Sequence, residues 1–512
     1  MKSIKYLVVA WGVVVTSMFT FTSCELESYD YSNINSGMFP KAEDDAEALV
    51  TSCYTPFRAN LQGGVFTVAK GVMTLGDLIS DVGESRPRGW TPLLYCSYTV
   101  NNNNGVVDNL FKYNSEIGRM TLTIDRIENL DIKQDLKDKY IAEVKCARGF
   151  LAFLMYDYFG PTPIADLETL KKPLEEKPLP RLTEEQMREF IVTNLSEAAN
   201  VLPATYNKEK NPAGFDTDYG RFTSGLCNMV LLKFYMKIGD WKNAEMVGRK
   251  LIDKNVYGYD LMDNYEDIFT LANEGNKEII WAINAAQGIQ EHLWFAELLP
   301  SIYPEGDGVN KWGDHYISWY FLEKHPFQEG DKRFSRIVAE FEDKNGVVHN
   351  KENDFKKEGN FLGFGAICGT KYKIEAVAAQ KCYKDLIIYR YADAITLLAE
   401  AIVRNSNQVT PEALGFLNEV RKRAGLDIYQ PTDINGVEDF LEKVLEERGH
   451  ELWWEGCRRQ DLIRHGKFIE EIKAKADYVG EKSLVNEHYY LLPLPQSAID
   501  EGKGLVENND GF

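Results

Sequence analysis

The sequence lacks the short motifs that mark most enzyme classes. Its 512 residues contain no H-E-x-x-H, no G-x-S-x-G, no phosphate-binding P-loop and no EF-hand loop. None of the eight cysteines forms a C-x-x-C pair, which argues against a zinc ribbon and a thioredoxin-like redox site. A glycosidase needs two catalytic carboxylates, but the chain has 78 acidic residues, so their spacing in sequence does not single out one pair. We therefore expect no catalysis, no cofactor and no dedicated metal site.

The sequence also lacks an excess of positive charge. Removing the two lysines of residues 1–23 leaves 56 basic against 78 acidic residues, a balance of −22. A chain this acidic has no general attraction for nucleic acid or anionic lipid, so neither is an expected partner. After the N-terminus, no apolar run reaches the ~20 residues that a membrane-spanning helix needs.

The N-terminal segment predicts export and lipidation. Lys2 and Lys5 precede an apolar stretch at residues 7–21, the arrangement of a secretory signal peptide. The following "FTSCELES" resembles a bacterial lipobox, in which the thiol of Cys24 would carry the lipid after cleavage at residue 23. The alternative is ordinary secretion with Cys24 unmodified. The acidic residues after Cys24 resemble the tag of lipoproteins that face outward from the outer membrane.

Helical periodicity dominates the rest of the chain. Apolar residues recur at three- and four-residue steps over 136–159, and Pro161 and Pro163 end that helix. Thr183 is the expected N-cap of the next helix. Residues 226–255 predict a helix pair joined by "IGDW", with partial similarity to a tetratricopeptide unit. A second pair follows at 389–425, where Thr410 is the expected N-cap, and a further helix covers 436–456.

Two stretches differ from this helical pattern. Residues 60–115 and 257–385 are rich in Gly, Asn and aromatic residues, with strand-like runs at 278–284 and 336–341. We expect these loop-rich regions to pack beside a scaffold formed mainly by 30–60, 116–255 and 386–470. The fold class expected is mainly α, with tetratricopeptide-like helix pairs, as one globular domain over 24–512.

The run "ERGHE" at 447–451 has two interpretations. Its acids and His450 suggest metal ligands, but no second ligand-bearing motif accompanies them. We favour a structural ion-pair network around Arg448. The cysteines in apolar helical patterns are expected to be buried thiols, and the sequence does not show whether any of them pair.

Several motifs in a fixed order carry a family resemblance. They are "FLAFLMYDYFGPTPI" after Arg148, "GDWKNAEMVGRKLI", "YRYADAITLLAEA", "LNEVRKRAG", "EERGHELWWEGCRRQDLIRHGKF", "YYLLPLP" and the closing "ENNDGF". Together with the lipobox, this set resembles the SusD/RagB family of surface glycan-binding lipoproteins over nearly the whole mature chain. The family's signature residues are expected to be structural, in buried ion pairs and helix-end contacts: Arg148, Arg448, Glu451, Glu455, Arg458 and Asp461.

The resemblance implies a function as well as a fold. It implies a protein that is anchored on the outer membrane, faces outward, binds oligo- or polysaccharide and passes it to a TonB-dependent transporter without catalysis. Two alternatives stay open: a glycoside hydrolase, and a tetratricopeptide adaptor that binds only protein.

The candidate glycan contacts come from the loop-rich regions. A sugar ring has apolar faces and polar edges, so its site needs aromatic platforms with hydrogen-bonding groups at the rim. Trp90 and Trp312 lie beside Gly and charged residues, and we expect both indoles to be exposed, whereas Trp319 is expected in the core. The predicted site comprises Trp90, Trp312, Arg86, Arg88, Asn310, Lys311 and Tyr316.

Overall fold

The computed structural model describes residues 40–60, 63–175, 177–206, 218–306, 308–354, 368–379 and 381–512. The predicted signal peptide and Cys24 lie outside these residues. In the part of the chain that is described, no helix combines the length and the apolar character needed to cross a membrane.

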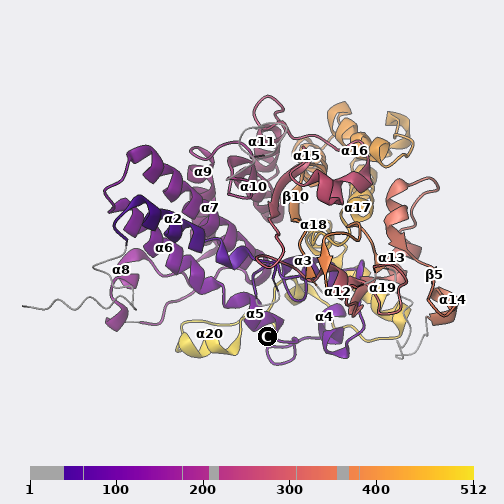
Figure 1. Ribbon diagram of the computed structural model, residues 1–512, viewed down its shortest axis with the longest axis horizontal. Helices are drawn as coiled ribbons and strands as arrows, with labels where there is room; N and C mark the ends of the chain where they lie inside the picture. Colours follow the sequence, from indigo (N-terminus) through magenta and orange to yellow (C-terminus); the bar gives the residue numbers. More distant parts are fainter. Residues whose placement is uncertain are drawn as a thin grey trace, which may run out of the picture.

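Long helices from both halves of the chain build the scaffold (Figure 1). The first half supplies α2 (Glu43–Ser52), α6 (Asn114–Glu128), α7 (Gln134–Phe159), α9 (Glu184–Ala199), α10 (Ser224–Ile238) and α11 (Trp241–Leu251). The second half supplies α15 (Tyr391–Ser406), α16 (Pro411–Arg423), α17 (Gly436–Leu452), α18 (Arg458–Arg464) and α19 (Phe468–Val479).

These helices pack on one another in sequence. Helix α6 contacts α7, α7 contacts α9, α9 contacts α10, and α10 pairs with α11. Helix α11 then contacts α15, which also packs against α16 and α17. The α11–α15 contact joins the two halves into one helical body, so the predicted mainly α class with tetratricopeptide-like pairs is confirmed.

Local sequence signals explain where the helices begin and end. The Thr183 side chain accepts a hydrogen bond from the Gln186 N–H, and the Thr410 side chain accepts one from the Ala413 N–H, as predicted for N-caps. Helix α7 ends at Gly160, whose φ of 71° turns the chain before the prolines. Both predicted caps and this helix end are therefore confirmed.

The remaining elements are short. The further helices are α3 (Val72–Leu78), α4 (Thr91–Leu94), α5 (Val106–Phe111), α8 (Leu167–Leu170), α12 (Trp294–Leu298), α13 (Trp319–Lys324), α14 (Lys351–Asp354) and α20 (Gln496–Glu501). The single-turn 3₁₀ helices are η1 (Thr55–Phe57), η2 (Arg88–Trp90), η3 (Pro173–Glu175), η4 (Tyr265–Phe269), η5 (Leu271–Asn273), η6 (Lys332–Arg336), η7 (Pro431–Asp433) and η8 (Glu487–Tyr490).

Within the described residues the strands form five two-stranded antiparallel sheets. The run at 278–284 is strand β2 (Ile279–Ile283), which pairs with β10 (Leu386–Arg390). The run at 336–341 is not one strand: it divides into β4 (Ile337–Val338) and β5 (Phe341–Glu342), which pair with β7 (Cys368–Gly369) and β6 (Val348–His349). The other two sheets join β1 (Gly83–Ser85) to β3 (His315–Ile317) and β8 (Val377–Ala378) to β9 (Lys381–Cys382).

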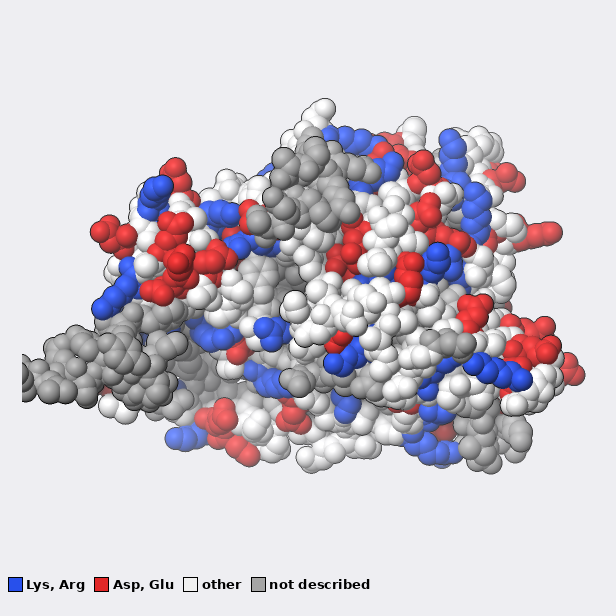
Figure 2. Space-filling view, in the orientation of Figure 1, with Lys and Arg blue, Asp and Glu red and all other residues white. Residues whose placement is uncertain are grey.

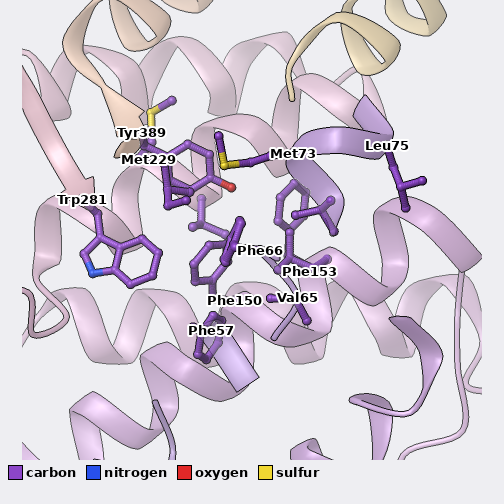
Figure 3. Close-up of a cluster of buried hydrophobic side chains, with 14 of the residues drawn as sticks. Phe57, Val65, Phe66, Met73, Leu75, Phe150, Phe153, Met229, Trp281 and Tyr389 are labelled. Atoms are coloured by element: carbon purple, nitrogen blue, oxygen red, sulfur yellow. The ribbon is translucent and has the colours of Figure 1, made fainter. Parts of the chain in front are cut away.

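Aromatic side chains link these elements at the centre of the molecule (Figure 3). The Phe150 ring of α7 lies 5.1 Å from Phe57, 5.8 Å from Trp281 of β2 and 5.8 Å from Tyr389 of β10. All four side chains are buried. Burial of such large rings supplies much of the stability of a core, and here it ties the β2–β10 sheet to the helical scaffold.

A buried ion-pair network joins the C-terminal helices, as the signature residues predicted. Arg390 lies 2.8 Å from Glu278 and 2.7 Å from Glu455, and it also pairs with Glu451. Arg448 contacts Asp393 and Asp461, each at 2.8 Å. Arg148 differs from this pattern, because its guanidinium donates to the side chains of Asn194 and Thr121 in neutral contacts.

The residues of "ERGHE" take part in this network. Glu447 pairs with Arg333 and Arg421, and Glu451 pairs with Arg333, Arg390 and Arg423. The imidazole of His450 is bonded to the His325 carbonyl at 2.9 Å. The two acids of this run therefore form buried ion pairs, as predicted, but their partners are other arginines: Arg448 pairs with Asp393 and Asp461 instead.

The charged side chains and the cysteines differ in where they lie in the structure. On the face drawn in Figure 2, acidic and basic side chains are interspersed rather than gathered in one patch. Among the residues that the structure describes, six cysteines are free and buried: Cys53, Cys96, Cys146, Cys227, Cys382 and Cys457. They pack as small hydrophobic side chains.

Candidate ligand-binding site

The two loop-rich regions meet in a short antiparallel ribbon. Strand β1 pairs with β3 in the register Gly83 with Ile317, Glu84 with Tyr316 and Ser85 with His315. The pairing continues past the strand end, where the Arg86 N–H donates to the Asp314 carbonyl at 2.8 Å. Residues more than 220 positions apart in sequence are thereby placed side by side.

The ribbon fixes the backbone of Trp312. The Arg86 guanidinium donates to the Trp312 carbonyl at 2.6 Å and to the Asp314 carboxylate at 3.2 Å. On its other side, the Trp312 N–H donates to the carbonyl of Ala296, in α12, at 2.7 Å. The Trp312 side chain is half-buried, so an indole held by its own backbone keeps part of its surface in solvent.

A glycine makes the turn after Trp312 possible. Gly313 has φ of 60°, and a Cβ at this position would lie 2.6 Å from Cα of Pro300. Only glycine satisfies both conditions without displacing the backbone. The chain can therefore pass directly from the exposed side of Trp312 into the buried strand β3.

The expectation that Trp90 is exposed is wrong. Trp90 is only 4% exposed, and its ring meets the His315 imidazole edge to face at 5.0 Å. The exposed Arg88 and Gly89 stand before it on η2, but the next residue begins α4 and turns the indole inward. Tyr316 is also buried, at 3% exposure, because it lies inside β3 opposite Glu84.

Of the other predicted residues, Arg86 contacts Trp312, and Asn310 and Lys311 precede it in sequence. Arg86, Arg88 and Asn310 are exposed, and Lys311 is half-buried. The Lys311 ammonium donates to the carbonyls of Tyr303 and Glu305, and the Asn310 N–H donates to the Ala379 carbonyl. The structure thus brings Arg86 against Trp312 and holds Asn310 and Lys311 on the same segment as the indole.

Two titratable groups lie under this surface. Burial and the neighbouring Asp314 carboxylate raise the pKa of Glu297, on α12, to about 7, against a smaller lowering by Lys70. Burial lowers the pKa of His315 to about 4, so its imidazole is neutral at pH 7. Its Nδ1 lies 3.0 Å from the Ser85 hydroxyl, and its Nε2 lies 3.7 Å from Glu297. These contacts hold the ribbon against α12.

Comparison with known proteins points to the SusD family. The family model described as the SusD family matches residues 277–512. A SusD-like protein, P25, from Formosa agariphila is 24% identical, with 76% of this chain and 77% of that protein covered. The starch-binding protein SusD from Bacteroides thetaiotaomicron is 22% identical, with coverage of 77% and 76%. These matches support membership of the SusD/RagB family.

Solved structures of similar proteins share the fold. The surface glycan-binding protein A from Bacteroides thetaiotaomicron, solved in complex with laminarihexaose, superposes with a TM-score of 0.72 at 23% identity. That match covers 91% of this chain and 99% of the other. The SusD fold therefore extends well beyond the segment that the family model matches.

Several residues of the site were not predicted from the sequence. Glu297, Ser85 and Asp314 belong to no recognisable motif. Their roles depend on the pairing of β1 with β3, which joins positions remote in sequence. The one usable signal was the glycine after Trp312, since Gly often marks a turn or a close backbone approach.

Proposed function

We propose that the chain binds oligo- or polysaccharide at the surface around Trp312. The observation that carries this proposal is the half-buried indole, fixed by backbone hydrogen bonds from Arg86 and to Ala296. An immobilised aromatic face with charged and amide groups at its edge matches a sugar ring, whose faces are apolar and whose edges are polar.

The proposed glycan contacts are Trp312, Arg86, Arg88, Asn310 and Lys311. Trp90 and Tyr316 are buried and support the ribbon from within. Similar proteins bind this class of ligand, since one is a starch-binding protein and another was solved in complex with laminarihexaose.

Delivery to a transporter is the second part of the proposal. A lipidated Cys24 would hold the protein on the outward face of the outer membrane, where a TonB-dependent transporter is the expected partner. Two proteins confined to one membrane meet at high effective concentration, so a modest interface between them can persist. The support is the lipobox and the family resemblance, and gentle detergent extraction followed by identification of co-purifying proteins tests it.

We also propose that residues 24–512 form a single globular domain. In support, one connected cluster of buried hydrophobic residues runs from Ala46 to Leu492. Both loop-rich regions contribute to this cluster, through Trp90 and Trp281 among others.

One observation favours the glycoside hydrolase as a second candidate. Glu297 has a pKa raised to about 7 and lies near the Asp314 carboxylate, and glycosidases use two carboxyl groups of which the general acid has a raised pKa. However, the Glu297 side chain is only 6% exposed and faces His315, whereas a general acid must reach the glycosidic oxygen. Binding without turnover is therefore the better supported function.

A paired experiment separates these functions. Calorimetric titration with a panel that includes starch and laminarin oligosaccharides should give saturable binding to at least one glycan. A reducing-end assay on the same samples should show no hydrolysis. Release of reducing ends would support the hydrolase, and failure of every glycan to bind would favour a protein-binding adaptor.

A further inference from the structure

Three side chains from distant parts of the chain converge at the base of the β1–β3 ribbon. They are Asp81, two residues before β1, His325, just after α13, and Glu471 on α19. Nε2 of His325 lies 3.4 Å from Oδ2 of Asp81 and 3.7 Å from Oε2 of Glu471. The three atoms all lie within 4.8 Å of one another.

The charges at this point are incompletely balanced. The Asp81 side chain is fully buried and that of Glu471 is 7% exposed. Arg458 donates two hydrogen bonds to Asp81, each at 2.8 Å, but Glu471 receives a neutral donor, the Tyr320 hydroxyl, at 2.7 Å. A buried carboxylate is costly unless a positive charge accompanies it. Arg458 therefore pairs directly with Asp81, whereas among the described residues Glu471 has no arginine or lysine within ion-pair distance.

The same ring nitrogen of His325, Nε2, faces both carboxylates. Nε2 of His325 is buried and has no hydrogen-bond partner in the part of the chain that the structure describes. Two carboxylate oxygens and an imidazole nitrogen therefore meet at one buried point, which favours a positively charged species there, either a proton on Nε2 or a metal ion.

The two separations from Nε2 fit a small divalent ion. If an ion lay ~2.0–2.2 Å from each ligand atom, as zinc does, the angle at the ion between Nε2 and the oxygen would be about 110° for Asp81 and about 125° for Glu471. Such angles are close to tetrahedral, and one imidazole with two carboxylates is a zinc-type donor set. Calcium instead takes six to eight oxygen ligands, which three side chains do not supply.

We propose that Asp81, His325 and Glu471 bind one Zn²⁺-class ion, with water completing the coordination. The His325 side chain is 18% exposed, so part of the imidazole ring reaches solvent. The bound ion ties the segment before β1 and the end of α13 to α19. It therefore clamps the base of the ribbon whose other end carries Arg86 and Trp312.

The test is zinc binding to the full chain after treatment with a chelator. Calorimetry with ZnCl₂ at pH 7.5 should show one site per chain, and zinc should raise the melting temperature, whereas MgCl₂ should not. His325→Gln and Glu471→Gln should each weaken zinc binding at least tenfold. Glu471→Gln keeps an oxygen for the Tyr320 hydroxyl, and the melting temperature without zinc verifies that each variant is folded.

A second histidine provides the matched control. His349 also lies beside two carboxylates, but Asp343 is 3.5 Å from Nε2 while Asp354 is 3.2 Å from Nδ1. Ligands on opposite sides of the ring cannot share one ion, so His349→Gln should bind zinc as the unmodified chain does. The proposal is overturned if the chain binds no zinc, or if both triad variants keep the unmodified affinity, which would assign the positive charge to a proton on His325.

Discussion

The guanidinium of Arg86 donates a hydrogen bond to the Trp312 backbone carbonyl at 2.6 Å, across 226 positions of sequence. Because Arg86 is also partnered by Asp314, it holds the indole-bearing segment at a fixed distance from β1. We expect Arg86→Ala to lower glycan affinity several-fold, since the loosened segment loses conformational freedom on binding. Calorimetry measures the change.

The same substitution should barely change stability, since exposed ion pairs contribute at most about 1 kcal/mol. Arg249→Ala is the matched control, because that guanidinium is similarly exposed and pairs with Glu412 at 2.7 Å far from the ribbon in sequence. Equal affinities for the two variants would argue against a positioning role for Arg86.

Trp90 should behave as a core residue. Replacing its buried indole with Ala leaves a cavity beside His315, and such large-to-small changes cost about 3–5 kcal/mol. We expect Trp90→Ala to lower the free energy of unfolding by that order, measured by urea denaturation. A melting temperature equal to that of the unmodified chain would show that the indole is exposed.

Glu297 should make stability depend on pH. Its folded pKa is about 7, against a reference value of 4.5, so the folded state binds more protons than the unfolded state between these values. Stability should therefore fall as pH rises from about 4.5 through 7, by up to roughly 3 kcal/mol for this group. Glu297→Gln should remove that part of the slope in urea denaturation at pH 5, 6, 7 and 8. Parallel profiles for both proteins would contradict the raised pKa.

Membrane attachment should depend on one thiol. If Cys24 carries the lipid, Cys24→Ala should move the protein from the membrane to the soluble fraction, because a lipid anchor supplies the binding energy. Immunoblotting of fractionated cells measures this, with Cys53→Ala as the control since that thiol is buried in the core. Unchanged membrane association of Cys24→Ala would leave ordinary secretion or another anchor as the explanation.

The helical part of the fold was predictable because its signals are local. Periodicity and the hydroxyl of Thr183 or Thr410 act within a few residues, so the caps appear where the sequence indicates. The site was less predictable. Strands β1 and β3 are three residues each and pair across the length of the chain, which no short-range pattern records.

Burial of single aromatic side chains was also beyond local signals. Trp90 and Trp312 have similar neighbours in sequence, yet tertiary contact with His315 buries the first and leaves the second half-exposed. Likewise, Asp81, His325 and Glu471 have no common spacing, and only the packing of α19 beside the ribbon brings them together. The sequence indicated which residues lie near the site. It did not indicate how exposed they are, because long-range packing determines exposure.

The most direct test of the proposed glycan site is calorimetry on Trp312→Ala with the glycan that binds the unmodified chain. Truncating a central aromatic anchor commonly costs more than about 1 kcal/mol of binding, so affinity should fall at least several-fold while the melting temperature stays nearly constant. Trp241→Ala is the control, since that half-buried indole lies on α11 and stacks with Arg404. Unchanged affinity in Trp312→Ala, or an equal loss in Trp241→Ala, would contradict the assignment.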